Sequence, residues 1–199
     1  MTIRLGMPDI HRASLLLGQA FHDDPLLSYL LADPAKREHL SPKGFACILR
    51  YGVRYGEAQA TSSNMEGVSV WLPPQSAHAS IFKTVQVGAF SLPFSVGWRF
   101  FFRFLDYMGH VDELRKKHTP LPHWYLQLLG VEPRFQRQGH SSALLKPMLD
   151  RFDAEKLPCC LDTMNGGNVP FYERFGFKVV AESKVPKTHI GIWLMARSG

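Results

Sequence analysis

The chain has 199 residues, of which 45% are hydrophobic and 20% are charged, values typical of a globular protein with a buried core. Its formal net charge of +6 would suit acidic partners, including nucleic acid or a phosphorylated cofactor. The basic residues are dispersed, however, and residues 115–117 form the only dense run, so no nucleic-acid-binding stripe is predicted.

The first half of the chain predicts a mixture of strands and helices. In chain order the predicted elements are a strand at residues 2–5, helices at 8–21 and 25–31, a helix that opens at 41–42 and runs through 55, and a strand pair at 59–62 and 67–72. Two helix starts rest on a capping residue followed by proline, Asp24-Pro25 and Ser41-Pro42. Residues 32–34 are expected to end the second helix. Pro73 and Pro74 end the second strand, and a polar loop follows.

Residues 81–117 predict an amphipathic helical region. Trp98, Phe101, Phe102 and Leu105 share one helical face, which is expected to pack over the core. Arginines interrupt the region, so it contains no uncharged run of about 18 residues and a membrane span is excluded. Binding to a membrane interface is the weaker alternative.

No metal site is predicted. The three cysteines, two of them adjacent, match neither a disulfide framework nor a zinc-binding spacing. Asp106, His110 and Glu113 have the helical spacing of metal ligands, but no further ligand accompanies them, so a solvated helix face is the preferred interpretation.

The second half of the chain is organised around residues 128–148. A strand at 123–131 leads through a polar turn containing Gly139 into a helix. The unpaired N–H groups of a first helical turn point one way, and the helix dipole adds roughly half a positive charge, so such a turn can hold a phosphate. The remaining predicted elements are a strand at 157–162, a short helix at 168–175 and a closing strand pair at 177–181 and 189–195.

Two phrases in this half resemble the motifs of the GNAT N-acetyltransferase superfamily. The family's acetyl-CoA motif, Gln/Arg-x-x-Gly-x-Gly/Ala, is similar to the phrase Gln136-Arg137-Gln138-Gly139-His140-Ser141-Ser142. Its Tyr-Glu-x-x-Gly-Phe element is similar to the phrase from Tyr172 to Phe177, which follows at the family's distance. Ser141 departs from the family's Gly or Ala, which predicts weaker or rearranged phosphate contact. Residues 20–25 and 68–71 also resemble the branch of puromycin-type antibiotic N-acetyltransferases.

The resemblance implies a set of cofactor-binding residues. The turn would hold the diphosphate of acetyl-CoA through Gln136, Arg137, Gln138, Gly139, His140, Ser141 and Ser142. Main-chain groups of Leu129 and Val131 would pair with the pantetheine arm like an added strand, and the Val131 amide would face the thioester oxygen. Asn168 and Phe171 would lie beside the cofactor, although Asn168 could equally cap the helix that follows it.

Acetyl transfer to an amine also needs groups that move protons. An alkyl amine with a pKa of about 10.4 is only about one part in 2,500 free base at pH 7, so a base or a desolvating pocket is required. The resemblance implies that Tyr172 is the general acid, and hydrogen bonding to the departing thiolate is its expected role. Asp162, which ends one strand, and His123, which begins the neighbouring one, are the two candidate bases. The alternatives are that Asp162 caps the following loop and that His123 is a surface residue.

The acceptor is expected to bind against helices at about residues 7–57 and 78–117. The residues whose chemistry suits a cationic amine over an apolar floor are Asp23, Asp24, Asp106, Tyr29 and Trp71. For Asp24, capping the following helix is the preferred interpretation.

The sequence thus predicts an α/β fold, a mixed sheet with helices on both faces, in a single domain spanning residues 1–199 whose cofactor-binding core is at about 123–196. The predicted function is an acetyl-CoA-dependent N-acetyltransferase of a small-molecule amine that acts by direct attack in a ternary complex. The alternatives are an acetyltransferase of a protein N-terminus or lysine, and a CoA-binding regulatory module without turnover. No nucleic-acid or membrane partner is predicted, and a homodimer is left open. The N-terminus lacks a signal-peptide pattern, which predicts a cytoplasmic location.

Overall fold

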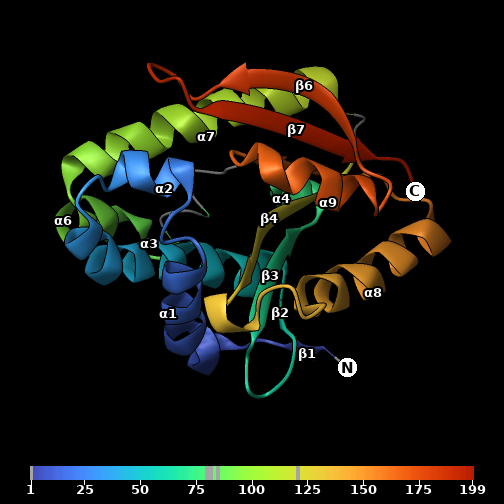
Figure 1. Ribbon diagram of the computed structural model, residues 1–199, viewed down its shortest axis with the longest axis horizontal. Helices are drawn as coiled ribbons and strands as arrows, with labels where there is room; N and C mark the ends of the chain where they lie inside the picture. Colours follow the sequence, from blue (N-terminus) through green and yellow to red (C-terminus); the bar gives the residue numbers. More distant parts are fainter. Residues whose placement is uncertain (1, 79–82, 84–85, 120–121) are drawn as a thin grey trace.

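The computed structural model describes every residue except 1, 79–82, 84–85 and 120–121. Within the described residues, seven strands form one sheet in the order β1-β2-β3-β4-β5-β7-β6 (Figure 1). The strands are Ile3–Arg4 (β1), Glu57–Ala60 (β2), Gly67–Leu72 (β3), Trp124–Val131 (β4), Cys159–Thr163 (β5), Lys178–Lys184 (β6) and Gly191–Arg197 (β7). β4 and β5 are parallel, and the other neighbouring strands are antiparallel. The predicted α/β fold with a mixed sheet is confirmed.

Helices cover both faces of this sheet. Their bounds are Ile10–Ala20 (α1), Pro25–Leu30 (α2), Pro34–Tyr55 (α3), Pro74–Ala77 (α4), Leu92–Val96 (α6), Trp98–His118 (α7), His140–Glu155 (α8) and Val169–Glu173 (α9). Short 3-10 turns lie at Met7–Asp9 (η1), Ala89–Ser91 (η2), Pro133–Phe135 (η3) and Gly166–Asn168 (η4). α1 and α3 pack on one face, α8 packs on the other, and α7 lies against β6 (Figure 1).

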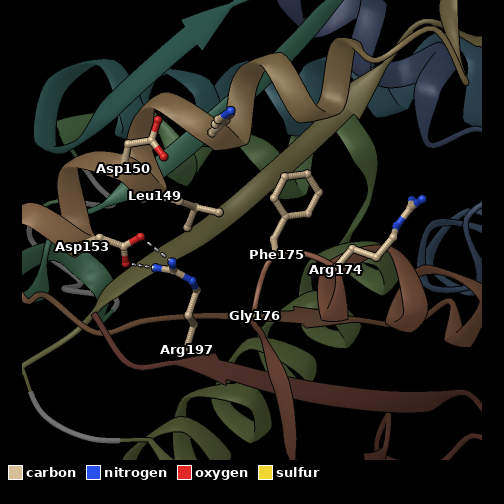
Figure 2. A pocket seen from close by; sticks show the side chains of 8 residues that line it. Leu149, Asp150, Asp153, Arg174, Phe175, Gly176 and Arg197 are labelled. Carbon is tan, nitrogen blue, oxygen red and sulfur yellow. Dashed lines mark hydrogen bonds and ion pairs between the residues drawn. The ribbon is translucent and has the colours of Figure 1, made fainter.

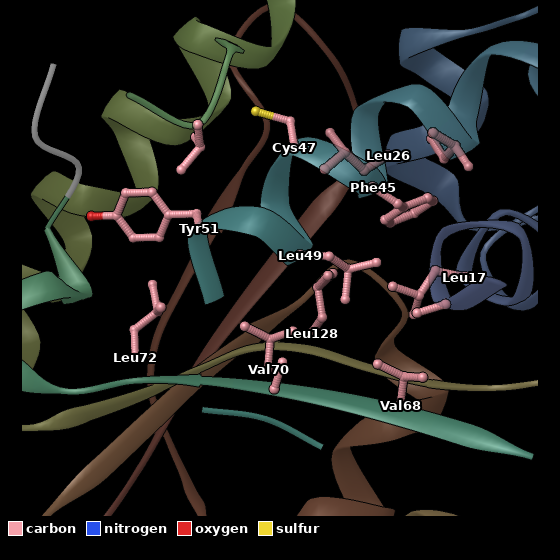
Figure 3. Packing of buried hydrophobic residues seen from close by; sticks show 14 of the residues in the cluster. Leu17, Leu26, Phe45, Cys47, Leu49, Tyr51, Val68, Val70, Leu72 and Leu128 are labelled. Carbon is pink, nitrogen blue, oxygen red and sulfur yellow. The ribbon is translucent and has the colours of Figure 1, made fainter. Parts of the chain in front are cut away.

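Alternation along β3 divides the core between the two faces. Leu17 of α1 and Leu49 of α3 pack with Val70 on the first face, as Figure 3 shows. On the opposite face the Trp71 ring meets the Phe152 ring of α8 edge-on, with centroids 5.2 Å apart. Successive strand residues point to opposite faces, so the two helical layers are both anchored by the same strand.

The start of α3 differs from the prediction. α3 begins at Pro34, where the Asp33 carboxylate accepts hydrogen bonds from the amides of Ala35 and Lys36 at 3.0 and 3.4 Å. Asp33-Pro34 is therefore the same start signal as Asp24-Pro25. Residues 32–34 do follow the end of α2 at Leu30, as predicted, but they also begin α3. Pro42 lies inside the helix, where its missing N–H leaves one helical hydrogen bond unmade.

The predicted packing face of α7 is also wrong. Trp98, Phe102 and Leu105 are exposed, and the helix instead buries Phe100 and Tyr107. Phe100, Tyr107, Val111 and Arg115 follow the helical spacing i, i+7, i+11, i+15. The buried stripe is therefore longer than the predicted face. The predicted polar loop after Pro73 contains the short helix α4, and residues 81–82 and 84–85 of the predicted 81–117 region lie outside the described residues.

Candidate active site

The parallel strands β4 and β5 part halfway along their length. Their register runs from Trp124 opposite Cys159 only as far as Leu126 opposite Leu161. β4 continues to Val131 beside β3, so its β5-facing edge has no strand partner over residues 127–131 within the described chain. Unpaired main-chain donors and acceptors therefore face the gap between the two strands.

A register shift in β4 lies at the beginning of this gap. Val70 pairs with Leu128 and Trp71 pairs with Leu126, which leaves Gln127 as an extra residue opposite β3. Such a bulge bends a strand and increases its twist, so it helps to turn the end of β4 away from β5.

The turn after β4 leads directly into the N-terminus of α8. Gly139 adopts φ +87° and precedes the first helical residue, His140, so it has no side chain to cap the free amides of the first turn. The side-chain amide of Gln136 donates to the Val131 carbonyl at 3.2 Å, and that of Gln138 donates to the Arg134 carbonyl at 3.0 Å. Both side chains hold the turn in shape, while the amides of the first turn of α8 remain able to bind an anion.

The positive φ of Gly139 makes a matched pair of substitutions informative. A Cβ at Gly139 or at Gly109 of α7 would meet nothing within 4 Å, but only Gly139 is left-handed. Gly139→Ala is expected to cost about 1–2 kcal/mol and to weaken CoA binding about tenfold, because relaxing the strain redirects the amides. Gly109→Ala is expected to keep CoA affinity and to stabilise the helix slightly. Titration calorimetry with CoA checks both, and equal affinities in the two variants would contradict the assignment of the turn.

A large cavity lies beside the diverging strands β4 and β5. Its volume is about 600 Å³, and its walls come from α2, α3, α7, β4 and β5. Among the described residues that line it, only Asp24 and Asp162 carry a charged side chain. The cavity is therefore apolar with two carboxylates, which is the kind of wall that receives a cation.

Two tyrosines hold the carboxylate of Asp162. The Tyr107 hydroxyl donates to Oδ2 at 2.5 Å, and the Tyr125 hydroxyl donates to Oδ1 at 2.6 Å. Burial, followed by the Asp162 charge, raises the pKa of both phenols well above its usual value, so both stay protonated donors. The Arg115 guanidinium lies 3.9 Å from the centre of the Tyr125 ring. A carboxylate has about four acceptor positions, so Asp162 keeps room for a further hydrogen-bond donor.

Asp24 reaches the same cavity from the start of α2. Its carboxylate accepts from the amides of Leu26 at 2.9 Å and Leu27 at 3.1 Å, which confirms the predicted helix cap. Burial raises the pKa of Asp24, the two amide hydrogen bonds oppose that rise, and the negative charge of Asp162 adds to it. Both carboxylates line the same cavity, so their like charges oppose each other there.

An Asp24→Asn variant separates the cap from the charge. The raised pKa means that the folded protein holds the Asp24 proton more tightly than the unfolded chain, so this contribution to stability is lost as the pH rises above 3.8 through the raised value. Asparagine caps a helix about as well as aspartate. The variant is expected to match or exceed the wild-type Tm at pH 7 and to lose the part of the pH dependence of stability that comes from Asp24. Its KM for the amine is expected to rise, while its affinity for CoA is unchanged. Thermal unfolding across this pH range and initial-rate kinetics check these expectations; a lower Tm at pH 7 would argue against them.

Tyr172 of α9 also lines the cavity. Its side chain is buried, and burial, with the charge of Asp162 second, raises the pKa of the phenol, so it is a protonated donor. Phe171 packs beside it with ring centroids 5.1 Å apart, but Phe171 is not part of the cavity wall. Asn168 is exposed and lines the cavity; its side chain makes no capping bond and donates to the Thr163 hydroxyl at 3.3 Å.

Other residues predicted for the site lie elsewhere. His123 is buried rather than on the surface, 3.3 Å from the Thr119 hydroxyl and outside the cavity wall. Four predicted acceptor residues also lie outside the cavity wall. Asp23 contacts His22, and Asp106 pairs with Lys187. The Tyr29 ring lies under the Arg103 guanidinium, and Trp71 faces α8. His110 contacts the Ser183 hydroxyl, and the described residues contain no group of three His, Cys, Asp or Glu side chains that could hold a metal.

The sequence analysis did not identify Tyr107 and Tyr125. Tyr107 belongs to the buried stripe of α7. A tyrosine hydroxyl on a buried helix stripe needs a hydrogen-bond partner, and this was the signal in the sequence that could have identified it. Tyr125 lies in a strand of otherwise mostly apolar residues, where a buried hydroxyl requires a partner.

A second hollow of about 440 Å³ lies beside the C-terminal part of α8 (Figure 2). Arg197 of β7 meets Asp153 there through two contacts of 2.6 and 2.7 Å, and hydrogen bonding to Arg197 lowers the pKa of Asp153. None of its lining residues belongs to the larger cavity. The ion pair ties α8 to β7, which is a structural role.

Comparisons with known proteins bear on the family and the fold of the chain. Residues 103–198 match the family model of the acetyltransferase (GNAT) domain. An uncharacterised N-acetyltransferase of Schizosaccharomyces pombe is 27% identical over 180 residues, which cover 87% of this chain and 72% of that protein. The described residues contain no helix long and apolar enough to cross a membrane.

Two solved structures share the fold. The first, described as histone acetyltransferase HPA2 and related acetyltransferase from Corynebacterium glutamicum, has a TM-score of 0.68 at 17% identity and covers 99% of this chain and 94% of its own. The second, arylalkylamine N-acetyltransferase 2 from Aedes aegypti, has a TM-score of 0.61 at 14% identity, with 100% and 98% covered.

The matches define the chain as an N-acetyltransferase enzyme. Residues 103–198 contain a GNAT acetyltransferase domain, and proteins of this family transfer an acetyl group from acetyl-CoA to amines. The matches do not test the predicted likeness to the puromycin-type branch, which stays a prediction.

Proposed function

We propose that this chain transfers the acetyl group of acetyl-CoA to the amine of a small molecule by direct attack in a ternary complex. The observation that carries the proposal is one cavity, bounded by the parting strands β4 and β5, that contains both a carboxylate and a buried phenol, Asp162 and Tyr172. Asn168 and Phe90 line the cavity and are both exposed, which supports access from solvent at more than one part of the wall.

The donor side of the site fits acetyl-CoA. The open, left-handed turn at Gly139 with the free amides of α8 would hold the diphosphate, with Ser141 and Ser142 near the same helix end. The unpaired edge of β4 would bind the pantetheine arm through Leu129 and Val131. The Val131 carbonyl already accepts from Gln136, so its amide is the group left to bind the donor.

When bound, acetyl-CoA supplies an acetyl group activated as a thioester. Asp162 then accepts the proton of the acceptor ammonium, directly or through a water, because it has free acceptor positions and lines the cavity. His123 lies outside the wall, so the geometry favours Asp162 as the base. Tyr172 donates a hydrogen bond to the sulfur as negative charge develops, since its raised pKa keeps the proton on the phenol.

The shape of the cavity supports a small acceptor. A protein N-terminus or lysine would need an open groove, whereas the aromatic side chains of Phe100, Phe101, Phe104 and Tyr107 of α7 line this cavity. Calorimetry with CoA followed by a thiol-release assay over small amines and short peptides tests the proposal. Release with small amines is the expected result. Release with peptides alone would favour the protein acceptor, and CoA binding without any release would favour a regulatory module.

A further inference from the structure

The acceptor end of the cavity has a one-sided distribution of charge. No Lys, Arg, His or Glu side chain lines the cavity within the described residues, so Asp24 and Asp162 are its only charged groups. Both carboxylates line the same cavity, and burial first and the charge of Asp162 last raise the pKa of Asp24. A positively charged group between them would relieve this repulsion, and an ammonium supplies such a charge. The side-chain oxygen of Gln127 is buried in the same wall without a hydrogen-bond partner among the described residues, so it is a further acceptor.

The part of the wall that α2, α3 and α7 form is mainly apolar, with Ser41, Tyr51 and Tyr107 as its polar members. Helices α2, α3 and α7 contribute the side chains Leu30, Phe45, Ile48, Phe100, Phe101 and Phe104. A second charge or a peptide group placed against these rings would lose its water without gaining a partner. An alkyl chain or an aromatic ring would instead gain the free energy of leaving water.

The mouth of this apolar part is also apolar. Phe90 and Leu105 line the cavity and are 67% and 48% exposed, so they stand where the cavity opens to solvent. Outside the mouth, the exposed rings of Phe94, Trp98 and Phe102 pack on one another and continue the same surface. Apolar side chains therefore extend from the wall to the rim of the cavity.

Resting on the proposed acetyl transfer, we infer that the acceptor is an apolar monoamine. Its nitrogen binds between Asp24 and Asp162, and its alkyl or arylalkyl body lies along α2, α3 and α7 towards Phe90. The chemical class is set by one ammonium and a body with no second charge. Polyamines and peptides are excluded as good acceptors for the same reason.

A series of linear alkylamines from ethylamine to decylamine tests this class. Their pKa values are all close to that of lysine, about 10.4, so the free-base fraction does not vary along the series. We expect kcat/KM to rise about fourfold per methylene until the cavity is filled. Hexylamine is expected to exceed 1,6-diaminohexane by at least about 100-fold, because the diamine must bury its second ammonium. Calorimetry of octylamine and 1,8-diaminooctane without acetyl-CoA is expected to show the same order of affinity.

Two phenylalanines at the rim provide a matched pair of variants. Phe90 lines the cavity, whereas Phe94 is 80% exposed and does not. Phe90→Ser is expected to flatten the dependence of kcat/KM on chain length for the longest amines, and Phe94→Ser is expected to keep it. A second, milder variant, Phe90→Leu, restores the dependence if apolar contact is the cause.

The outcomes separate this inference from the proposed function. A rise with chain length, a poor diamine and the predicted difference between the Phe90 and Phe94 variants support it. Thiol release that is flat with chain length, or that is faster with diamines or peptides, overturns it and leaves acetyl transfer standing. CoA binding with no release for any amine overturns both.

Discussion

Replacing Asp162 by asparagine is expected to lower kcat/KM for an amine acceptor by about 10²–10⁴ at neutral pH. The amide has nearly the same shape but cannot accept the proton of the ammonium, and it offers Tyr107 and Tyr125 an uncharged partner in place of a carboxylate. The difference in kcat/KM between Asp162→Asn and the wild type should shrink as the pH approaches the amine pKa of about 10, because the amine then enters as the free base and needs no catalytic base. Initial rates measured across this pH range check both the size and the trend.

Asp106→Asn is the matched control for this variant. Asp106 lies on α7 next to the buried stripe, but its carboxylate is exposed and pairs with Lys187 at 3.2 Å outside the cavity. We expect wild-type kinetics from it. Equilibrium CoA binding and thermal unfolding of Asp162→Asn distinguish a lost base from a damaged fold. A deficit that stays constant with pH would assign Asp162 to positioning and would remove it as the base.

Tyr172→Phe is expected to reduce kcat by about 10²–10³ without abolishing turnover. The thiolate of CoA, with a thiol pKa of about 8.5, is already a better leaving group than an amine, so a hydrogen bond helps and full protonation is not required. Burial raises the pKa of Tyr172, which keeps the donor proton in place but makes complete transfer to sulfur harder. Single-turnover kinetics at saturating acetyl-CoA measure this effect on the chemical step.

Tyr55→Phe makes the same chemical change outside the cavity. The Tyr55 hydroxyl contacts Gln86 and the residue is not part of the wall, so its kcat should equal that of the wild type. CoA affinity of Tyr172→Phe is expected to stay within about twofold, because the phenol is assigned to the sulfur in the transition state rather than to ground-state binding. A wild-type kcat in Tyr172→Phe would exclude Tyr172 from the mechanism.

The turn and the two helix starts on the proposed donor side were predictable because each is local in the chain. The turn at Gly139, the start of α8 and the position of Tyr172 on a short helix each depend on a few neighbouring residues and their backbone preferences. Asp24 was predictable as a cap for the same reason, since its acceptors are the next amides along the chain. The start of α3 was missed because Asp33-Pro34 serves both as an expected helix end and as the cap of the next helix.

The acceptor side depends on contacts between distant segments. Tyr107 is 55 residues from Asp162 in sequence and Tyr125 is 37, so no local pattern could join the three. Likewise, Trp71 had the chemistry of an acceptor residue, but the alternation of β3 turns it towards α8. Whether a strand residue faces the cavity or α8 depends on which helices pack on each face of the sheet.

By itself the sequence determined the fold class, the turn before α8 and the short helix that carries Tyr172, because backbone preference and periodic apolar residues act over a few positions. Only the tertiary structure decided that Asp162 and Asp24 line the same apolar cavity and that His123 lies outside its wall. Packing sets the direction of each side chain, and the helix and strand layers that enclose the cavity come from segments far apart in the chain.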